Sequence, residues 1–219
     1  MNEQGRAEPF WIMRDGSVVG ISEAEALLVD FVRKCEQVLE GAVNELVNFY
    51  TRNGQPQLAV EPLENLIRSI NNPERKAAAF LRMGALMERL KDFSAAASAY
   101  SQALALEPEN PELWYWTHNN LGFCLNQLGR HAEAEHFCRS AIEKDPSRHN
   151  AHKNLGVALA GQGQYLEAAG TFIKATHLNP RDPRALQHLN QLVVDHPVVL
   201  QDDPAMAAEV EECRRIGHS

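Results

Sequence analysis

The sequence predicts an all-α protein made of antiparallel helix pairs that stack on one another. Three observations lead to this fold class. A pattern of small and large apolar residues occurs three times with identical offsets, a proline closes each copy, and the apolar residues within a copy recur at i, i+3 and i+4 spacing. Because that spacing lines one face of a helix, each copy predicts two helices packed face to face.

Each copy of the pattern is centred on a glycine, at Gly84, Gly122 or Gly156. An alanine follows 12 residues later, and both positions are small because two helices must approach closely there. A proline follows 24 residues after the glycine and ends the second helix, since proline cannot continue it. The turns between paired helices are predicted at Lys91-Asp92, Gly129-Arg130 and Gly163-Gln164, where glycine tolerates a left-handed backbone.

This pattern resembles the tetratricopeptide repeat, a helix-turn-helix unit of 34 residues. The resemblance covers about half of the chain and implies a superhelix of three repeats, over residues 73–108, 111–146 and 147–180. The chain departs from the pattern at Met83, where leucine is usual, and at Cys138, where an aromatic residue is usual. The first two glycines are also separated by 38 residues. The extra residues include Asn110, a predicted N-cap, and Pro111, so we expect about one additional helical turn there.

The segments on either side of the repeats are predicted to complete the superhelix. Residues 22–72 predict N-terminal helices with a degenerate repeat, in which Val47 replaces the close-contact glycine. The helix that starts near Ser22 either caps the first repeat or merges with the next helix. Residues 182–196 predict a capping helix over the last apolar face, and residues 204–216 predict a C-terminal helix. Residues 1–21 predict a short non-helical arm, either a hairpin or an extended segment.

Composition excludes several classes of protein. The chain of 219 residues is 44% hydrophobic and 23% charged, and its formal net charge is −8, which argues against a nucleic acid partner. No stretch approaches the roughly 18 apolar residues of a spanning helix, so we expect no membrane insertion. The N-terminus lacks the features of a secretory signal, and the four cysteines form no CxxC pair. Together these features predict a cytoplasmic protein.

No arrangement of residues predicts catalysis. The sequence contains no HExxH, no GxSxG, no phosphate-binding GxxxxGK[ST] and no GxGxxG after a strand. His118 and His152 occupy a repeat position that usually packs between helices, and Cys124 and Cys138 also fall at packing positions. We therefore predict no catalytic residue, no metal site, no cofactor and no enzymatic activity.

The first helix of each pair is expected to line a concave groove, the usual binding surface of such superhelices. The predicted groove residues are Asn120, Asn154, Asn119, Lys153, Arg184, Phe123, Asn126, Trp116, Gln127, His188 and Arg82. Asn120 and Asn154 are the leading candidates, since an amide can donate to and accept from the backbone of an extended peptide. Similar proteins, including peptide-binding co-chaperones and O-linked N-acetylglucosamine transferase, use asparagines in this way. The alternative is that asparagine is only a common solvent-facing residue at this position.

The basic residues of the groove favour an acidic or mixed peptide segment. Lys153, Arg184 and Arg82 supply positive charge on an otherwise acidic protein. The resemblance extends in part to repeats that clamp a free C-terminal carboxylate, but Phe123 and Asn119 stand where that clamp has Asn and Lys. Trp114 and Trp116 are either anchors for a partner or packing residues.

These features predict a non-catalytic protein–protein interaction module, an adaptor, scaffold or chaperone that binds a partner's peptide segment. Cytoplasmic secretion chaperones with three such repeats are one similar subgroup. The alternatives are a homo-oligomer that associates through its N-terminal arm or an exposed end of the superhelix, and a regulatory subunit of a larger enzyme or secretion complex. A further alternative is a metal-binding protein that uses His118, His149 and His152.

Overall fold

The computed structural model describes residues 10–12, 18–201 and 203–217 of the chain. The chain divides into two compact units, residues 1–66 and 67–219, and each is described by itself. The described residues are almost entirely helical, which confirms the all-α prediction.

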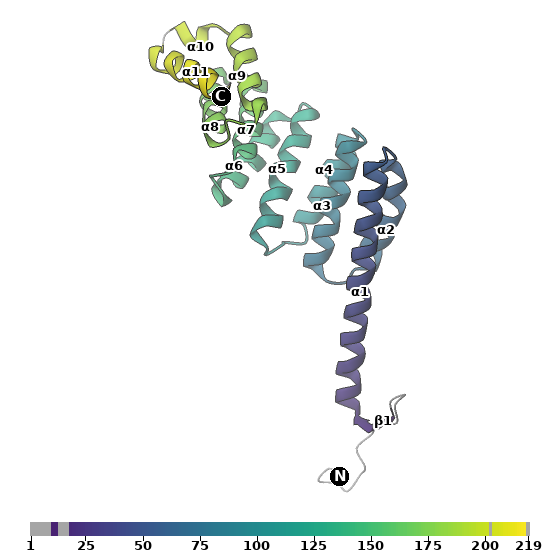
Figure 1. Ribbon diagram of the computed structural model, residues 1–219. Helices are drawn as coiled ribbons and strands as arrows, with labels where there is room; N and C mark the ends of the chain where they lie inside the picture. Colours follow the sequence, from purple (N-terminus) through teal and green to yellow (C-terminus); the bar gives the residue numbers. More distant parts are fainter. Residues whose placement is uncertain (1–9, 13–17, 202, 218–219) are drawn as a thin grey trace, which may run out of the picture. The chain divides into compact units, whose positions relative to one another are not determined.

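The N-terminal unit is dominated by one long helix. Strands β1 (Phe10–Ile12) and β2 (Val18–Gly20) pair antiparallel, with Trp11 opposite Val19. The rest of the predicted arm lies outside the described residues. Helix α1 (Ile21–Arg52) follows and has 32 residues, so it is about 48 Å long. The helix predicted to start near Ser22 has therefore merged with the next one, as one of the two predicted arrangements requires (Figure 1).

After α1 the chain reverses at Gly54, whose φ of 71° is left-handed. The short 3-10 helix η1 (Pro56–Ala59) leads into α2 (Val60–Ser69), with Ala59, Leu63 and Leu66 buried. The turn thus falls at the segment from Asn53 to Pro56, as the sequence predicted.

The second unit contains the three helix pairs, which Figure 1 shows stacked in chain order. They are α3 (Pro73–Arg89) with α4 (Phe93–Leu104), α5 (Pro111–Gln127) with α6 (His131–Lys144), and α7 (His149–Gly161) with α8 (Tyr165–Leu178). Each helix packs against its partner in the pair and against the following pair.

The inserted residues of the second pair lengthen its first helix. Asn110 caps α5, because its side chain accepts hydrogen bonds from the backbone N–H groups of Glu112 and Leu113. Pro111 occupies the first helical position, as expected. Helix α5 has 17 residues and α7 has 13, so the insertion adds about one turn.

The three glycines of the pattern lie where the helices of a pair touch. A Cβ atom built on Gly84 would lie 2.3 Å from the ring of Tyr100, and one on Gly156 would lie 2.5 Å from the ring of Phe172. A Cβ atom on Gly122 would lie 2.6 Å from Cys138 Sγ. These distances are too short for real contacts, so each pair can close to its observed separation only with glycine at this position.

The turns within the pairs share a left-handed residue. Gly129 and Gly163 have φ values of 73° and 77°, and Lys91 occupies the same place in the first pair with a φ of 61°. An L-residue in this conformation is strained by about 1 kcal/mol, which glycine avoids.

Three helices close the end of the superhelix, where the sequence predicted one capping helix. Helix α9 (Pro183–Asp195) is followed by α10 (Val198–Gln201) and α11 (Pro204–Ile216). Leu189 of α9 and Val210 of α11 are fully buried in one core with Phe172 of α8. Helix α11 therefore shares the capping duty with α9. Among the described residues, no helix combines the length and the apolar character needed to cross a bilayer.

Candidate functional site

The inner surface of the second unit is formed by α3, α5, α7 and α9, which contact one another in turn. All the predicted groove residues lie on these four helices. The structure leaves four of them exposed, namely Arg82, Gln127, Arg184 and His188. Three are half-buried, namely Trp116, Asn120 and Phe123. The remaining four are buried, namely Asn119, Asn126, Lys153 and Asn154.

Asn154 is part of a chain of polar contacts between helices. It is 3% exposed, and its Nδ2 donates to the backbone oxygen of Asn119 at 3.3 Å and to Asn119 Oδ1 at 3.1 Å. Asn119 Nδ2 in turn donates to Asn120 Oδ1 at 2.9 Å. Asn120 Nδ2 donates to the hydroxyl of Tyr100 at 3.4 Å, and that hydroxyl donates to Glu88. The contacts therefore run from the first pair to the third.

Asn126 makes a second polar contact between α5 and α7. Its Nδ2 donates to the backbone oxygen of Asn154 at 2.8 Å, and its Oδ1 accepts from His131 Nδ1 at 3.1 Å. The ring of His131 lies so close to Gly161 that a Cβ there would be 2.4 Å away. The buried asparagines thus hold the second pair against the third. Their predicted contact with a peptide stays a prediction, but the amide of Asn154 already has its donors engaged within the fold.

The aromatic groove candidates also make contacts within the fold. Phe123 packs edge-to-face on Phe93, with 5.9 Å between ring centroids. The guanidinium of Arg148 lies over the rings of Tyr115 and Trp116, at 4.7 and 5.3 Å from their centroids. Trp116 therefore has a cation over its ring, which favours the packing interpretation of this residue.

Lys153 is the buried charge of this surface. The residue is 7% exposed, and among the residues that the structure describes no hydrogen bond or ion pair engages its Nζ atom. Burial lowers the pKa of its ammonium, and the charge of Arg184 lowers it further, whereas Asp182 and Glu88 act in the opposite direction. A charge removed from water without a partner is costly, so a bound anion would stabilise it.

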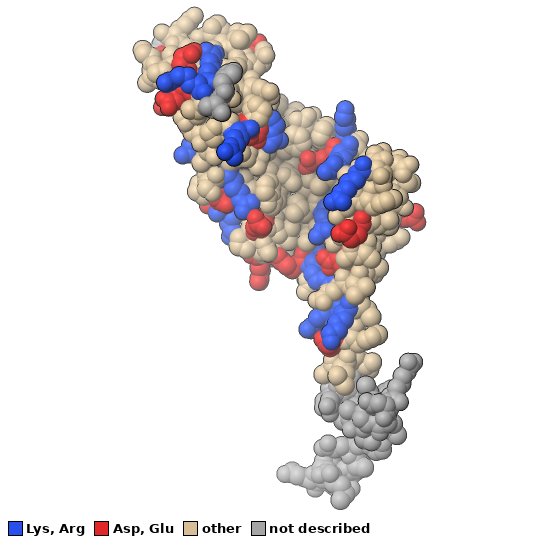
Figure 2. Space-filling view, in the orientation of Figure 1, with Lys and Arg blue, Asp and Glu red and all other residues tan. Residues whose placement is uncertain are grey.

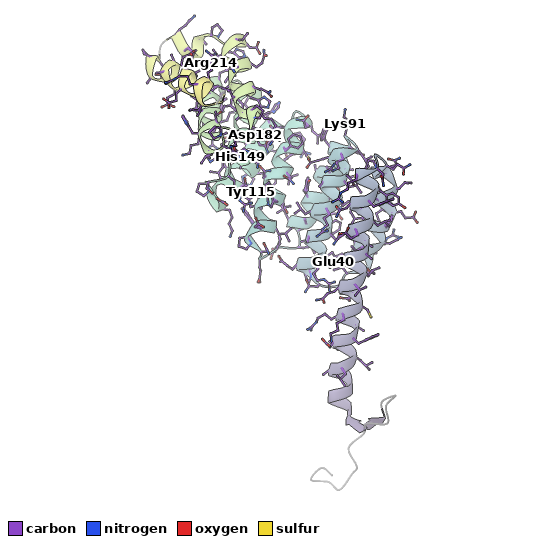
Figure 3. All side chains as sticks on the ribbon, viewed as in Figure 1. Glu40, Lys91, Tyr115, His149, Asp182 and Arg214 are labelled. Carbon is purple, nitrogen blue, oxygen red and sulfur yellow. The ribbon has the colours of Figure 1, made fainter. Side chains whose placement is uncertain are left out.

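The neighbouring Arg184 is neutralised by Asp182. Arg184 Nη2 lies 2.6 Å from Asp182 Oδ2, and His149 Nε2 donates to the same oxygen at 2.8 Å. Figure 3 shows His149 and Asp182 side by side. The hydrogen bond from Arg184 is the main reason why the pKa of Asp182 is far below its usual range. Figure 2 shows acidic and basic side chains interspersed over the face in view, without a continuous basic surface.

A recess of about 230 Å³ lies beside these charges, between α7, α8 and α9. Its walls include the apolar Val157, Phe172 and Leu192. His188 stacks on Phe172 at 5.5 Å between centroids, and His196 stacks on Tyr165 at 3.5 Å. Burial lowers the pKa of His188, as do the charges of Lys153 and Arg184, so its ring is neutral near pH 7.

The sequence analysis did not find this recess. A signal was present, because His188, Leu192 and His196 follow at intervals of four along the capping helix and therefore share one face. That spacing alone does not reveal a hollow, since the opposite wall comes from α7 and α8.

The structure offers no activated nucleophile among the residues proposed for packing. Burial raises the pKa of the Cys138 thiol to about 12 and also raises that of Cys124, so both are protonated at neutral pH. The rings of His118 and His152 each donate to a backbone oxygen, of Trp114 and Pro146 respectively, at 2.9 Å. In the part of the chain that the structure describes, no three His, Cys, Asp or Glu side chains are grouped to hold a metal.

The helix pairs match a known family. Residues 87–155 and residues 125–192 each match the family model described as "Tetratricopeptide repeat". The chain belongs to the tetratricopeptide repeat family. Proteins of this family are in general non-catalytic modules of protein–protein interaction, and this tetratricopeptide repeat protein has the fold for that role.

A curated relative shares part of this fold. The small glutamine-rich tetratricopeptide repeat-containing protein 2 of Mycosarcoma maydis is 32% identical over 90 residues, which are 41% of this chain and 24% of that protein. The chain thus matches about a quarter of the relative's length.

Two solved structures are similar over most of the tetratricopeptide repeat chain. Residues 41 to the end of MamA from Desulfovibrio magneticus RS-1 align with a TM-score of 0.62 and 23% identity, covering 83% of this chain and 98% of that one. YrrB, described as a TPR protein with an unusual peptide-binding site, aligns with a TM-score of 0.57 and 18% identity, covering 78% and 84%. At these identities the likeness concerns the fold.

Proposed function

We propose that this protein is an adaptor, scaffold or chaperone that binds an extended, acidic segment of a partner protein along α5, α7 and α9. The observation that carries the proposal is Lys153, a buried lysine whose ammonium has no partner among the described residues. Such a group is costly in an empty groove and becomes favourable when an anion binds.

The surroundings of Lys153 define the anion further. Asp182 already balances Arg184 at 2.6 Å, so Lys153 carries the unbalanced positive charge of this part of the groove. A single carboxylate, from Asp, Glu or a chain terminus, is the partner that a lone ammonium suits. Gln127 and Arg82 lie exposed on α5 and α3 and extend the polar surface along the groove.

The recess next to Lys153 suits an apolar side chain of the same segment. Its volume of about 230 Å³ and its walls of Val157, Phe172 and Leu192 fit one large aliphatic or aromatic group. The two stacked histidines at its edge are held by their rings, which keeps the recess open. We therefore expect a motif in which an apolar residue lies within a few positions of an acidic residue.

A displayed library of random peptides tests the proposal without knowledge of the natural partner. We expect the selected peptides to be enriched in Asp and Glu near an apolar residue. The affinity of the best peptide is then measured by fluorescence anisotropy for the wild-type protein and for Lys153→Met, which keeps the length of the side chain. We expect at least a tenfold loss of affinity for Lys153→Met, since the buried carboxylate loses its counter-charge.

The matched control is Lys174→Met, which removes an exposed lysine of α8. This change lowers the net charge equally and should leave the affinity within about twofold. Peptides without acidic enrichment, or equal losses in both variants, would show that Lys153 does not define the site.

We also propose a cytoplasmic location. All four cysteines are free thiols, and Cys124, Cys138 and Cys213 are buried as such. Free buried thiols are typical of a reducing compartment. Alkylation of the intact protein from its native cell, followed by mass spectrometry, tests whether any of the four is oxidised.

A further inference from the structure

Helix α1 presents an apolar face that nothing in the described structure covers. Between residues 26 and 42, the large apolar side chains that are exposed along this face are Leu27, Leu28, Phe31, Val32, Val38 and Leu39. Phe31 is 63% exposed and Val38 is 73% exposed. Monomeric proteins rarely leave a contiguous apolar surface of this kind open to water.

The spacing of this face is that of a helix that pairs with another helix. Leu28, Phe31, Cys35, Val38 and Ala42 follow one another at alternating intervals of three and four residues. This is the repeat by which two helices pack along a common seam. Val32 and Leu39 lie beside the seam and broaden it.

We propose that α1 associates with α1 of a second copy of this chain, through residues 27–42. A seam with this periodicity is complementary to itself, and a two-fold dimer uses the same surface on both subunits. The proposal is independent of the peptide site, which lies on α5, α7 and α9.

The charges of the segment permit two copies to approach. Residues 26–42 contain two basic and three acidic side chains, so the segment is almost neutral although the whole chain carries −8. One of the pairs is already formed within the helix, where Lys34 Nζ lies 2.7 Å from Asp30 Oδ2. Repulsion between two such helices is therefore small, and it would be large between average surfaces of this protein.

The exposed area also approaches what a stable dimer needs. An aromatic side chain such as Phe31 with 63% exposure offers on the order of 100 Å². The six large apolar side chains together offer on the order of 500 Å², and a standard interface buries roughly 800 Å² from each partner. The polar atoms beside the seam supply the remainder when two helices lie together.

The test is the mass of the full chain in solution, measured by sedimentation equilibrium between about 1 and 100 µM. We expect a reversible dimer for the wild type. The double substitution Phe31→Glu and Val38→Glu introduces two carboxylates into the seam, and we expect it to give a monomer with unchanged helical circular dichroism. Because both side chains are exposed in the single chain, the substitutions leave its folding intact.

The control is Val194→Glu on α9, whose valine is 73% exposed, the same as Val38. This variant should dimerise like the wild type. A monomeric wild type at 100 µM overturns the proposal, and so does a dimer that the double substitution leaves intact. A dimer weakened equally by Val194→Glu also overturns it, because the interface would then not be specific to α1. Loss of the dimer with retained peptide affinity would separate this proposal from that of the groove.

Discussion

Replacing Asn154 by alanine separates a structural role from a binding role. The side chain is buried, and its Nδ2 donates to the backbone oxygen and to the Oδ1 of Asn119. Alanine removes both hydrogen bonds and leaves buried acceptors on Asn119 without this donor. Each such loss costs about 1–2 kcal/mol, so we expect the free energy of unfolding to fall by about 2–4 kcal/mol.

Thermal unfolding followed by circular dichroism measures this effect. For a protein of this size, 1 kcal/mol shifts the midpoint by about 2–4 °C, so we expect Asn154→Ala to unfold roughly 10 °C lower. Asn150→Ala is the matched control on the same helix. Its side chain is half-buried and makes one contact at 3.5 Å, to Arg184, so we expect a shift of less than about 2 °C.

The reasoning is refuted if Asn154→Ala melts at the wild-type temperature and loses affinity for the selected peptide. That outcome would return Asn154 to the role that the sequence pattern suggested. Loss of stability without loss of affinity, measured well below the melting temperature, agrees with the contacts of the structure.

The remaining predictions concern the close contact, a turn and a buried carboxylate. Gly156→Ala places a methyl group 2.5 Å from Phe172 and should cost about 1–3 kcal/mol in urea unfolding, whereas Gly170→Ala, with no atom within 4 Å, should be neutral or stabilising. Lys91→Gly relieves a left-handed φ of 61° and should stabilise the protein by up to about 1 kcal/mol; a destabilised variant would mean that the lysine side chain matters more than its backbone. Because the folded pKa of Asp182 is lowered, its stabilising effect is present above about pH 4 and is lost as the pH falls further, so the wild type should exceed Asp182→Asn in stability at pH 7 and the difference should shrink steadily below pH 4. A difference that does not change with pH would contradict this assignment.

The helix pairs were predictable because their determinants are local. Gly84, Gly122 and Gly156 each require a small residue for a close contact, and the offsets to the following alanine and proline repeat without change. The extra turn of α5 followed from the N-cap at Asn110. What the pattern did not show is how far a polar side chain is buried by the next pair.

The asparagines illustrate this limit. Asn120 and Asn154 occupy equivalent positions 34 residues apart, yet the first is half-buried and the second is buried. The difference arises because Asn154 lies opposite Asn119, whereas the residue opposite Asn120 comes from a pair with different side chains. A contact between repeats depends on two sequences at once, and periodicity within one repeat carries no information on it. The extra capping helix α11 was missed as the same kind of contact, since Val210 and Leu189 meet only in space.

The polar contacts also determine the order in which the repeats can be arranged. Judged by glycine, alanine and proline alone, the three units are interchangeable, and a unit might be deleted or duplicated as in an engineered array. Yet the place that Asn119 holds in the second unit is held by Leu81 in the first and by Lys153 in the third. A chain lacking residues 111–146 would set the amide of Asn154 against a leucine. The units are therefore matched to their neighbours, and recombination of this gene would be tolerated at the turns within units only where the amide pairs are carried along together.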